Sequence, residues 1–122
     1  MIKLNRKNGR IDINLIAIEI GKDLCIILTG GEEHIGSITV GTAANKSKNI
    51  IIEGHKEHVL TRKIGEILTQ QNYWGNFVIC CGIHFDDITI DEIEDVMSLS
   101  CDMIEEMITK QKERLNRLGD NS

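Results

Sequence analysis

The first part of the chain alternates hydrophobic and polar residues with the two-residue period of β-strands. Residues 2–8 and 11–20 both show this alternation, and Asn8-Gly9 between them is a strong signal for a tight hairpin turn. Within residues 11–20 the hydrophobic positions change parity, which predicts a β-bulge near Leu15–Ala17 that switches the faces of the strand. We therefore expect a hairpin whose second strand is long and bent.

Four further segments have the composition of strands. Residues 24–29 form a continuous apolar run, which predicts a central strand covered on both faces. Residues 34–40 and 49–53 are shorter extended segments, separated by a small and polar loop at 41–48. Residues 77–83 are a second buried strand, too apolar for the edge of a sheet.

Two segments follow the helical period instead. Hydrophobic residues between Leu60 and Leu68 recur at helical spacing and predict an amphipathic helix that ends near Gln70. The last segment opens with a capping box, Thr89 with Glu92 three residues on, and has acidic residues at its start and basic residues at its end. This pattern predicts a helix of roughly 28 residues, about 40 Å long. Because that is long for a small domain, we expect part of it to pack against another subunit.

This order of elements predicts one α+β domain over residues 1–122. Its core is a mostly antiparallel β-sheet of five to six strands with two helices packed on it, one of them a long C-terminal helix. A chain of 122 residues suits a single domain, because two cores of half this size would each bury too little surface. Hydrophobic residues make up 41% of the chain and charged residues 27%, the balance of an ordinary globular protein.

The charge of the chain excludes some classes of partner. A formal net charge of −5 argues against nucleic acid and anionic membrane surfaces, because both require clustered Lys and Arg. Residues 1–6 lack the apolar centre of a signal peptide, and no stretch approaches the roughly 20 apolar residues of a membrane span. We expect a cytoplasmic protein with neither kind of partner.

The cysteines show no metal-binding or redox spacing. No two of them form a CxxC pair, and all lie in apolar segments, so we interpret them as reduced core residues: Cys25, Cys80, Cys81 and Cys101. Burial in such segments also raises a thiol pKa and limits nucleophilic reactivity. The carboxylates of the last helix are typical of a solvated face. The sequence thus predicts no catalytic residue.

All four histidines lie in three glycine-bearing clusters, Gly30–Gly36, Gly54–His58 and Gly82–Asp87. Each cluster stands at the end of a predicted strand, where loops commonly build binding pockets. In the first cluster, Gly30-Gly31 either brings backbone N–H groups close to a phosphate or carboxylate, or simply shapes a turn.

The second and third clusters also have two interpretations each. Gly54, His55 and Lys56 stand before a helix, where an anion can dock, although a solvated helix start explains them equally well. His55 and His58 are spaced for metal binding with His34 or His84 as a third ligand. Gly82 permits close backbone approach. His84 is either a proton-exchanging site residue or a surface histidine, and the following aspartates either orient it or begin the last helix.

The ordered set of motifs resembles one known family. Thr29-Gly30-Gly31, His34-Ile35-Gly36, Gly54-His55-Lys56-Glu57 and Gly82-Ile83-His84 occur in the order seen in the small D-type accessory subunit of gallate and related hydroxyaryl-acid decarboxylases. That family is a prenylated-flavin chaperone-like domain with a fold similar to proteasome assembly chaperones. Two departures leave open a relative with another client: Ser37 partly replaces the family's run of small residues after His34-Ile35-Gly36, and Glu53 stands where a proline is expected before Gly54.

The resemblance implies a non-catalytic, dimeric protein that helps a separate decarboxylase acquire or keep prenylated flavin mononucleotide (FMN), which it binds transiently. The motif positions then become ligand- or partner-binding residues: Gly30, Gly31, His34, Gly36, Gly54, His55, Lys56, Gly82 and His84. Two alternatives stay open. One is a small metal-dependent enzyme built on the four histidines, and the other is a homodimeric protein-interaction module of the proteasome-assembly-chaperone type.

Overall fold

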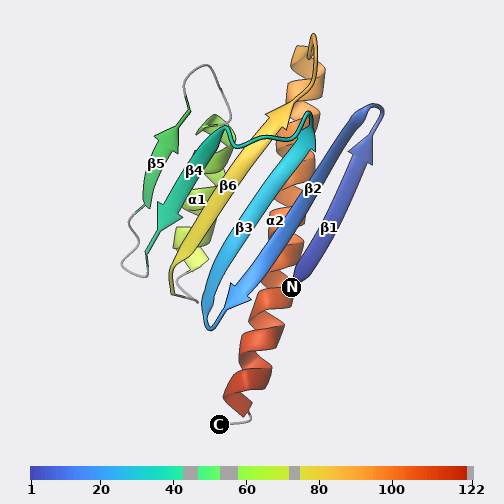
Figure 1. Ribbon diagram of the computed structural model, residues 1–122. Helices are drawn as coiled ribbons and strands as arrows, with labels where there is room; N and C mark the ends of the chain where they lie inside the picture. The colour runs from blue at the N-terminus through green and yellow to red at the C-terminus, as the bar shows by residue number, and fades with distance from the viewer. Residues whose placement is uncertain (43–46, 53–57, 72–74, 121–122) are drawn as a thin grey trace.

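A six-stranded β-sheet carries two helices on one of its faces (Figure 1). The computed structural model describes residues 1–42, 47–52, 58–71 and 75–120. In chain order the elements are β1 (Ile2–Asn8), β2 (Ile11–Ile20), β3 (Asp23–Gly31), β4 (Ser37–Gly41), β5 (Ser47–Ile51), α1 (His58–Gln71), β6 (Phe77–His84) and α2 (Ile90–Asp120). The predicted α+β class, the mostly antiparallel sheet and the long C-terminal helix are confirmed.

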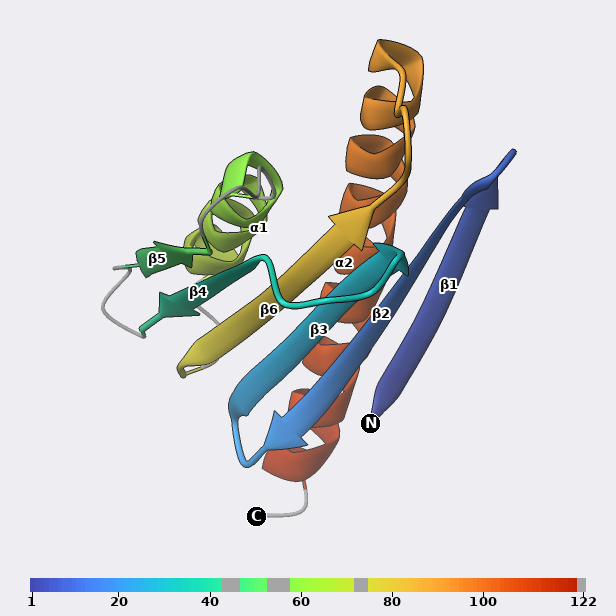
Figure 2. The ribbon, with the colours of Figure 1, turned by 45° about the horizontal axis from the view of Figure 1, so that its top comes forward.

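The strand order is β1-β2-β3-β6-β4-β5. The β3–β6 pair is parallel and the other four pairs are antiparallel. β6 therefore lies inside the sheet, as its composition predicted. Because β6 separates β3 from β4, residues 32–36 must cross the end of β6 to connect them (Figure 2). The extended segment expected at 34–40 is thus a crossover followed by β4.

The β1–β2 hairpin is confirmed, but the predicted bulge in β2 is wrong. Asn8 pairs with Ile11, so the turn residues are Gly9 and Arg10, with Gly9 at φ 60°. The register of β2 against β1 and β3 runs without interruption through residues 15–17. The hydrophobic residues change parity because one face of β2 is apolar along most of its length, whereas the other is polar at one end and apolar at the other.

The hydrophobic core lies between the sheet and the two helices. Alternate positions of β2, β3 and β6 point into it and meet the apolar stripes of α1 and α2. Removing each such side chain from water contributes roughly 1.5–3 kcal/mol. Its largest fully buried side chains include Ile13, Leu15, Ile26, Leu28, Ile64, Ile79, Met103, Ile104 and Met107.

The opposite face of the sheet has no helix on it among the described residues (Figures 1 and 2). The prediction that residues 24–29 are covered on both faces is therefore wrong. Leu24, Ile26 and Leu28 are buried, while Cys25 and Ile27 are only half-buried. Cys80 and Cys81 point to opposite faces, as expected, and Cys81 is the buried one. The assignment of Cys25 and Cys80 to the core is corrected accordingly, since both lie on the face of the sheet that neither described helix covers.

The predicted capping box at the start of α2 is confirmed. The Glu92 N–H donates to Thr89 Oγ1 at 3.1 Å, and the Thr89 N–H donates to Glu92 Oε1 at 3.1 Å. α2 then runs for 31 residues behind the sheet (Figure 1). Near its far end the Arg114 guanidinium donates to the Gly21 carbonyl at 2.7 Å. Neither described helix is both long enough and apolar enough to span a bilayer.

Candidate functional site

The crossover brings the first and third glycine-histidine clusters together. Gly31 pairs with His84 at the carboxyl ends of the parallel strands β3 and β6. The Glu32 N–H donates to the His84 carbonyl at 2.9 Å, and the Gly36 N–H donates to the Cys81 carbonyl at 2.7 Å. These bonds hold residues 32–36 across the end of β6. Two of the three predicted clusters therefore share one edge of the sheet.

The glycines of these clusters are required by the close approach of main chains. A Cβ atom on Gly82 would lie 1.5 Å from the His34 carbonyl oxygen, because the crossover packs directly on β6 there. Gly31 has φ +64°, and a Cβ atom on it would lie 2.0 Å from the His84 carbonyl oxygen. Gly30 is likewise packed against Ile13. Protein atoms, not an open cradle, thus occupy the space beside these glycines.

The two described histidines are held by short local contacts. His34 Nδ1 lies 2.9 Å from the Glu32 carbonyl oxygen and therefore donates to it, which fixes the proton on Nδ1. His84 Nε2 lies 3.0 Å from an oxygen of Asp86, and the His84 side chain is 52% exposed. Asp86 therefore orients His84, one of the two roles that the sequence suggested. Asp87 has φ 51° in the turn before α2.

The second cluster falls on residues that the structure does not describe. Gly54, His55 and Lys56 lie outside the described residues, as does the side chain of His58. The last described residue before them is Ile52, whose N–H donates to the Gly36 carbonyl at 2.9 Å. Ile52, the last described residue before the second cluster, is therefore bonded to the crossover. Gly36 bonds to both β6 and the segment after β5.

The chain matches the prenylated flavin chaperone LpdD-like domain over residues 7–112. It belongs to this family. The resemblance seen in the sequence is therefore confirmed. One chain in the crystal structure of a chaperone complex for yeast 20S proteasome assembly is similar in structure, with a TM-score of 0.47, 10% sequence identity, and coverage of 98% of this chain and 95% of that chain. No curated protein is detectably similar in sequence.

Membership of the prenylated flavin chaperone LpdD-like family indicates an accessory chaperone role. The chemical groups of the first and third clusters are therefore relevant to flavin binding. The first and third clusters offer imidazoles and the half-buried ring of Phe85. They also hold four carboxylates, those of Glu32, Glu33, Asp86 and Asp87, and no Lys or Arg. Within the sequences of the three clusters, the one Lys or Arg residue is Lys56.

The sequence did not predict the contact between Arg10 and Glu92, which connects the β1–β2 turn to the start of α2. Arg10, in the β1–β2 turn, donates from Nε and Nη2 to the two carboxylate oxygens of Glu92 at 2.7 and 3.0 Å. It also donates to the Asp86 carbonyl at 2.7 Å, and its guanidinium lies 5.9 Å from the centre of the Phe85 ring. The sequence carries no local signal for a pair separated by 82 positions.

The Arg10–Glu92 pair lowers the pKa of the Glu92 carboxyl group. The hydrogen bonds from Arg10, followed by those at the helix start, lower the pKa of Glu92 from 4.5 to about 2. The Arg10 pKa is raised by the same hydrogen bond. The carboxylate of Glu92 therefore caps α2 and holds the hairpin turn at the same time. Together with the hydrogen bond from Arg10 to the Asp86 carbonyl, these contacts connect the loop after β6 to the β1–β2 turn.

The metal site that the sequence suggested draws on His55 and His58, whose side chains lie outside the described residues. Within the described part of the chain, no three His, Cys, Asp or Glu side chains gather closely enough to hold a metal ion. His34 and His84 instead contact a carbonyl and a carboxylate, as given above. A groove among the described residues lies elsewhere, on α1, and its lining includes Val59, Arg62, Lys63 and Ile67.

Proposed function

We propose that this protein is a non-catalytic accessory chaperone that binds prenylated FMN transiently and supports a decarboxylase that uses it. One observation carries the proposal beyond family membership. Two motif segments far apart in the sequence meet where the parallel strands β3 and β6 end, the part of such sheets where ligands commonly bind. The third motif segment follows Ile52, which is bonded to the same crossover.

In this proposal the motif residues have separate tasks. Gly31 and Gly82 let the crossover pack closely on β6, and Gly36 bonds to both neighbouring segments. His34 and His84 offer hydrogen-bonding groups to the flavin ring or to the client. The remaining predicted residues, Gly30, Gly54, His55 and Lys56, complete the site, with Lys56 pairing with an anionic group of the ligand.

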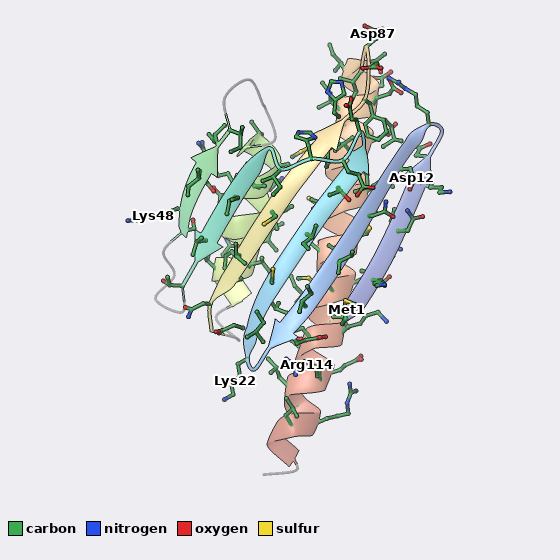
Figure 3. The ribbon with its side chains drawn as sticks, in the orientation of Figure 1. Met1, Asp12, Lys22, Lys48, Asp87 and Arg114 are labelled. Atoms are coloured by element: carbon green, nitrogen blue, oxygen red, sulfur yellow. The ribbon has the colours of Figure 1, made fainter. Side chains whose placement is uncertain are left out.

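The first test is a titration of the protein with FMN and with prenylated FMN, followed by flavin absorbance and by thermal shift. We expect the prenylated form to bind, and Lys56→Ala to weaken its binding about tenfold or more through loss of one charge-assisted contact. Lys22→Ala is the matched control, because Lys22 is exposed in the turn at the other end of the sheet (Figure 3). It should bind as the unchanged protein does.

The second test concerns the client. A prenylated-FMN-dependent decarboxylase produced together with this protein should contain more bound prenylated flavin than the same enzyme produced alone. His34→Ala and His84→Ala should reduce that gain without unfolding the chaperone. The proposal fails if neither the free protein nor its complex with a decarboxylase takes up flavin, and if flavin content of the enzyme is the same in both preparations.

A further inference from the structure

The sheet ends on one side at β5, whose outer edge has no neighbouring strand among the described residues (Figure 1). On its inner side β5 pairs with β4 in antiparallel register. In such a pair the main-chain N–H and C=O groups of successive residues point alternately to the neighbouring strand and away from it. The register with β4 therefore decides which residues of β5 have main-chain groups on the outer edge.

One hydrogen bond sets this alternation. The Ile52 N–H donates to the Gly36 carbonyl at 2.9 Å, and this pair continues the register of β5 with β4. Because hydrogen-bonded pairs recur at every second residue, Ile50 and Lys48 also direct their main-chain groups to β4. The residues whose N–H and C=O groups point away from the sheet are Ser47, Asn49 and Ile51.

Side-chain contacts hold β5 and β4 in place under α1. Thr39 Oγ1 on β4 donates to the side-chain carbonyl oxygen of Asn49 on β5. The Ser37 hydroxyl, also on β4, donates to Thr61 Oγ1 on α1 at 3.3 Å. α1 packs over β4 and β5 on the same face of the sheet (Figures 1 and 2). The free main-chain groups on the outer edge of β5 therefore keep the fixed spacing of a strand.

The opposite edge of the sheet, formed by β1, is protected by charged side chains. Arg6 forms an ion pair with Glu106 of α2, and the Lys7 ammonium lies 3.7 Å from the Asp12 carboxylate. Charged side chains along an edge strand oppose the addition of another strand. β5 has a single charged residue, so it is the edge that favours strand addition.

The charges near β5 favour an acidic partner. The described side chains of β5 and α1 include three cations, Lys48, Arg62 and Lys63, and one carboxylate, Glu66. All four are exposed. The whole chain has a formal net charge of −5, so this side of the molecule is positive in an otherwise acidic protein. Lys48 projects outward from β5 (Figure 3).

We propose that the outer edge of β5 binds an extended, acidic segment of another protein, which joins the sheet as a further strand. A β-strand offers N–H and C=O groups at the spacing that the outward groups of β5 require. Ile50 and Ile51, on opposite faces of β5, are 59% and 46% exposed, so apolar side chains of the added strand gain contacts on both faces. Lys48 and the cations of α1 select carboxylates in the same segment.

Amide hydrogen exchange followed by NMR tests this proposal residue by residue. In the protein alone, the Asn49 and Ile51 amides should exchange fast and the Ile50 and Ile52 amides slowly. The probe is a capped peptide of about eight residues that alternates valine and threonine and has a glutamate near each end. When about nine-tenths of the protein is bound, exchange at Asn49 and Ile51 should be about tenfold slower. The same peptide with lysine in place of glutamate should bind more weakly.

Ile51→Pro removes an outward N–H group and leaves the hydrogen bonds between β5 and β4 in place. It should raise the Kd of the glutamate peptide about tenfold or more. Ile51→Ala is the matched control, because it keeps the N–H group, and its Kd should stay within about threefold of that of the unchanged protein. Lys48→Glu should raise the Kd about fivefold, whereas Lys22→Glu, in the turn at the other end of the sheet, should leave it unchanged.

Three results overturn the proposal. Slow exchange at Asn49 and Ile51 in the protein alone means that this chain or a second copy already covers the edge. Unchanged exchange at both amides up to about 1 mM peptide means that no strand joins there. Equal binding by Ile51→Pro, or slowed exchange in β1 instead, places the peptide elsewhere. The test contains neither flavin nor decarboxylase, so its outcome is independent of the proposed function.

Discussion

At the scale of single residues, the glycines of the motifs show how one sequence feature has two possible causes. Glycine at a strand end permits either a ligand or another main chain to approach closely. From the sequence, either a ligand or another main chain could lie beside Gly31 and Gly82. The structure places a carbonyl oxygen beside each of them, so their first task is to let the crossover lie on β6.

We predict that Gly82→Ala destabilises the protein by about 2 kcal/mol or more, because the new methyl group would lie 1.5 Å from the His34 carbonyl oxygen and main-chain atoms would have to shift. Urea unfolding measures this change. Gly65→Ala in α1 is the control, since its Cβ would lie 3.3 Å from a Thr39 methyl group and the gain in helix propensity offsets the contact. An equal loss in both variants would contradict the role assigned to Gly82.

The Arg10–Glu92 pair predicts a defined dependence on pH. The folded state lowers the pKa of Glu92 from 4.5 to about 2, so the pair stabilises the fold fully above pH 4.5 and loses its effect as pH falls toward 2. Glu92→Gln should therefore lower the Tm at pH 7, and the difference from the unchanged protein should shrink across that window.

Thermal unfolding at several pH values checks this prediction. Glu94→Gln is a suitable control, because Glu94 is an exposed glutamate in the same first turns of α2. Its Tm difference should be small at every pH. A Glu92→Gln difference that is constant from pH 7 down to pH 2 would show that the hydrogen-bonded cap matters and the charge does not.

At the scale of elements, alternation and helical periodicity were sufficient to find every strand and both helices. The error in β2 came from assuming that its hydrophobic residues all face one core. Ile16 and Ile18 face the open side and their neighbours Leu15 and Ala17 face the helices, so the strand is apolar on both sides over this stretch. A change of parity in sequence therefore does not require a bulge.

The packing of α2 gives a prediction at this scale. Ile104 is fully buried against the sheet, whereas Ile93 on the same helix is 48% exposed. We expect Ile104→Ala to cost about 2–4 kcal/mol, through lost burial and the cavity left behind, and Ile93→Ala to cost less than about 0.5 kcal/mol. Denaturant unfolding of the two variants measures the difference. Similar values for both would mean that α2 does not pack on the sheet as described.

At the scale of the whole molecule, the sheet order is what unites the candidate site. β6 enters between β3 and β4 although it comes after both in the chain. This insertion forces residues 32–36 over β6 and brings His34 and His84 to the same edge. Both described helices lie on one face of this sheet.

The sequence by itself determined the local structure: strand and helix segments, the α2 cap, the first hairpin, whose turn at Gly9-Arg10 lies one residue after the expected Asn8-Gly9, and the glycine-histidine clusters at strand ends. Each of these depends on neighbours in the chain, through periodicity, capping or turn conformation. Only the tertiary structure decided the order of the strands, the Arg10–Glu92 contact and which face of the sheet the described helices cover. Those depend on pairings between distant residues, which no local pattern encodes, because a strand's period states that it has two faces and not what covers each of them.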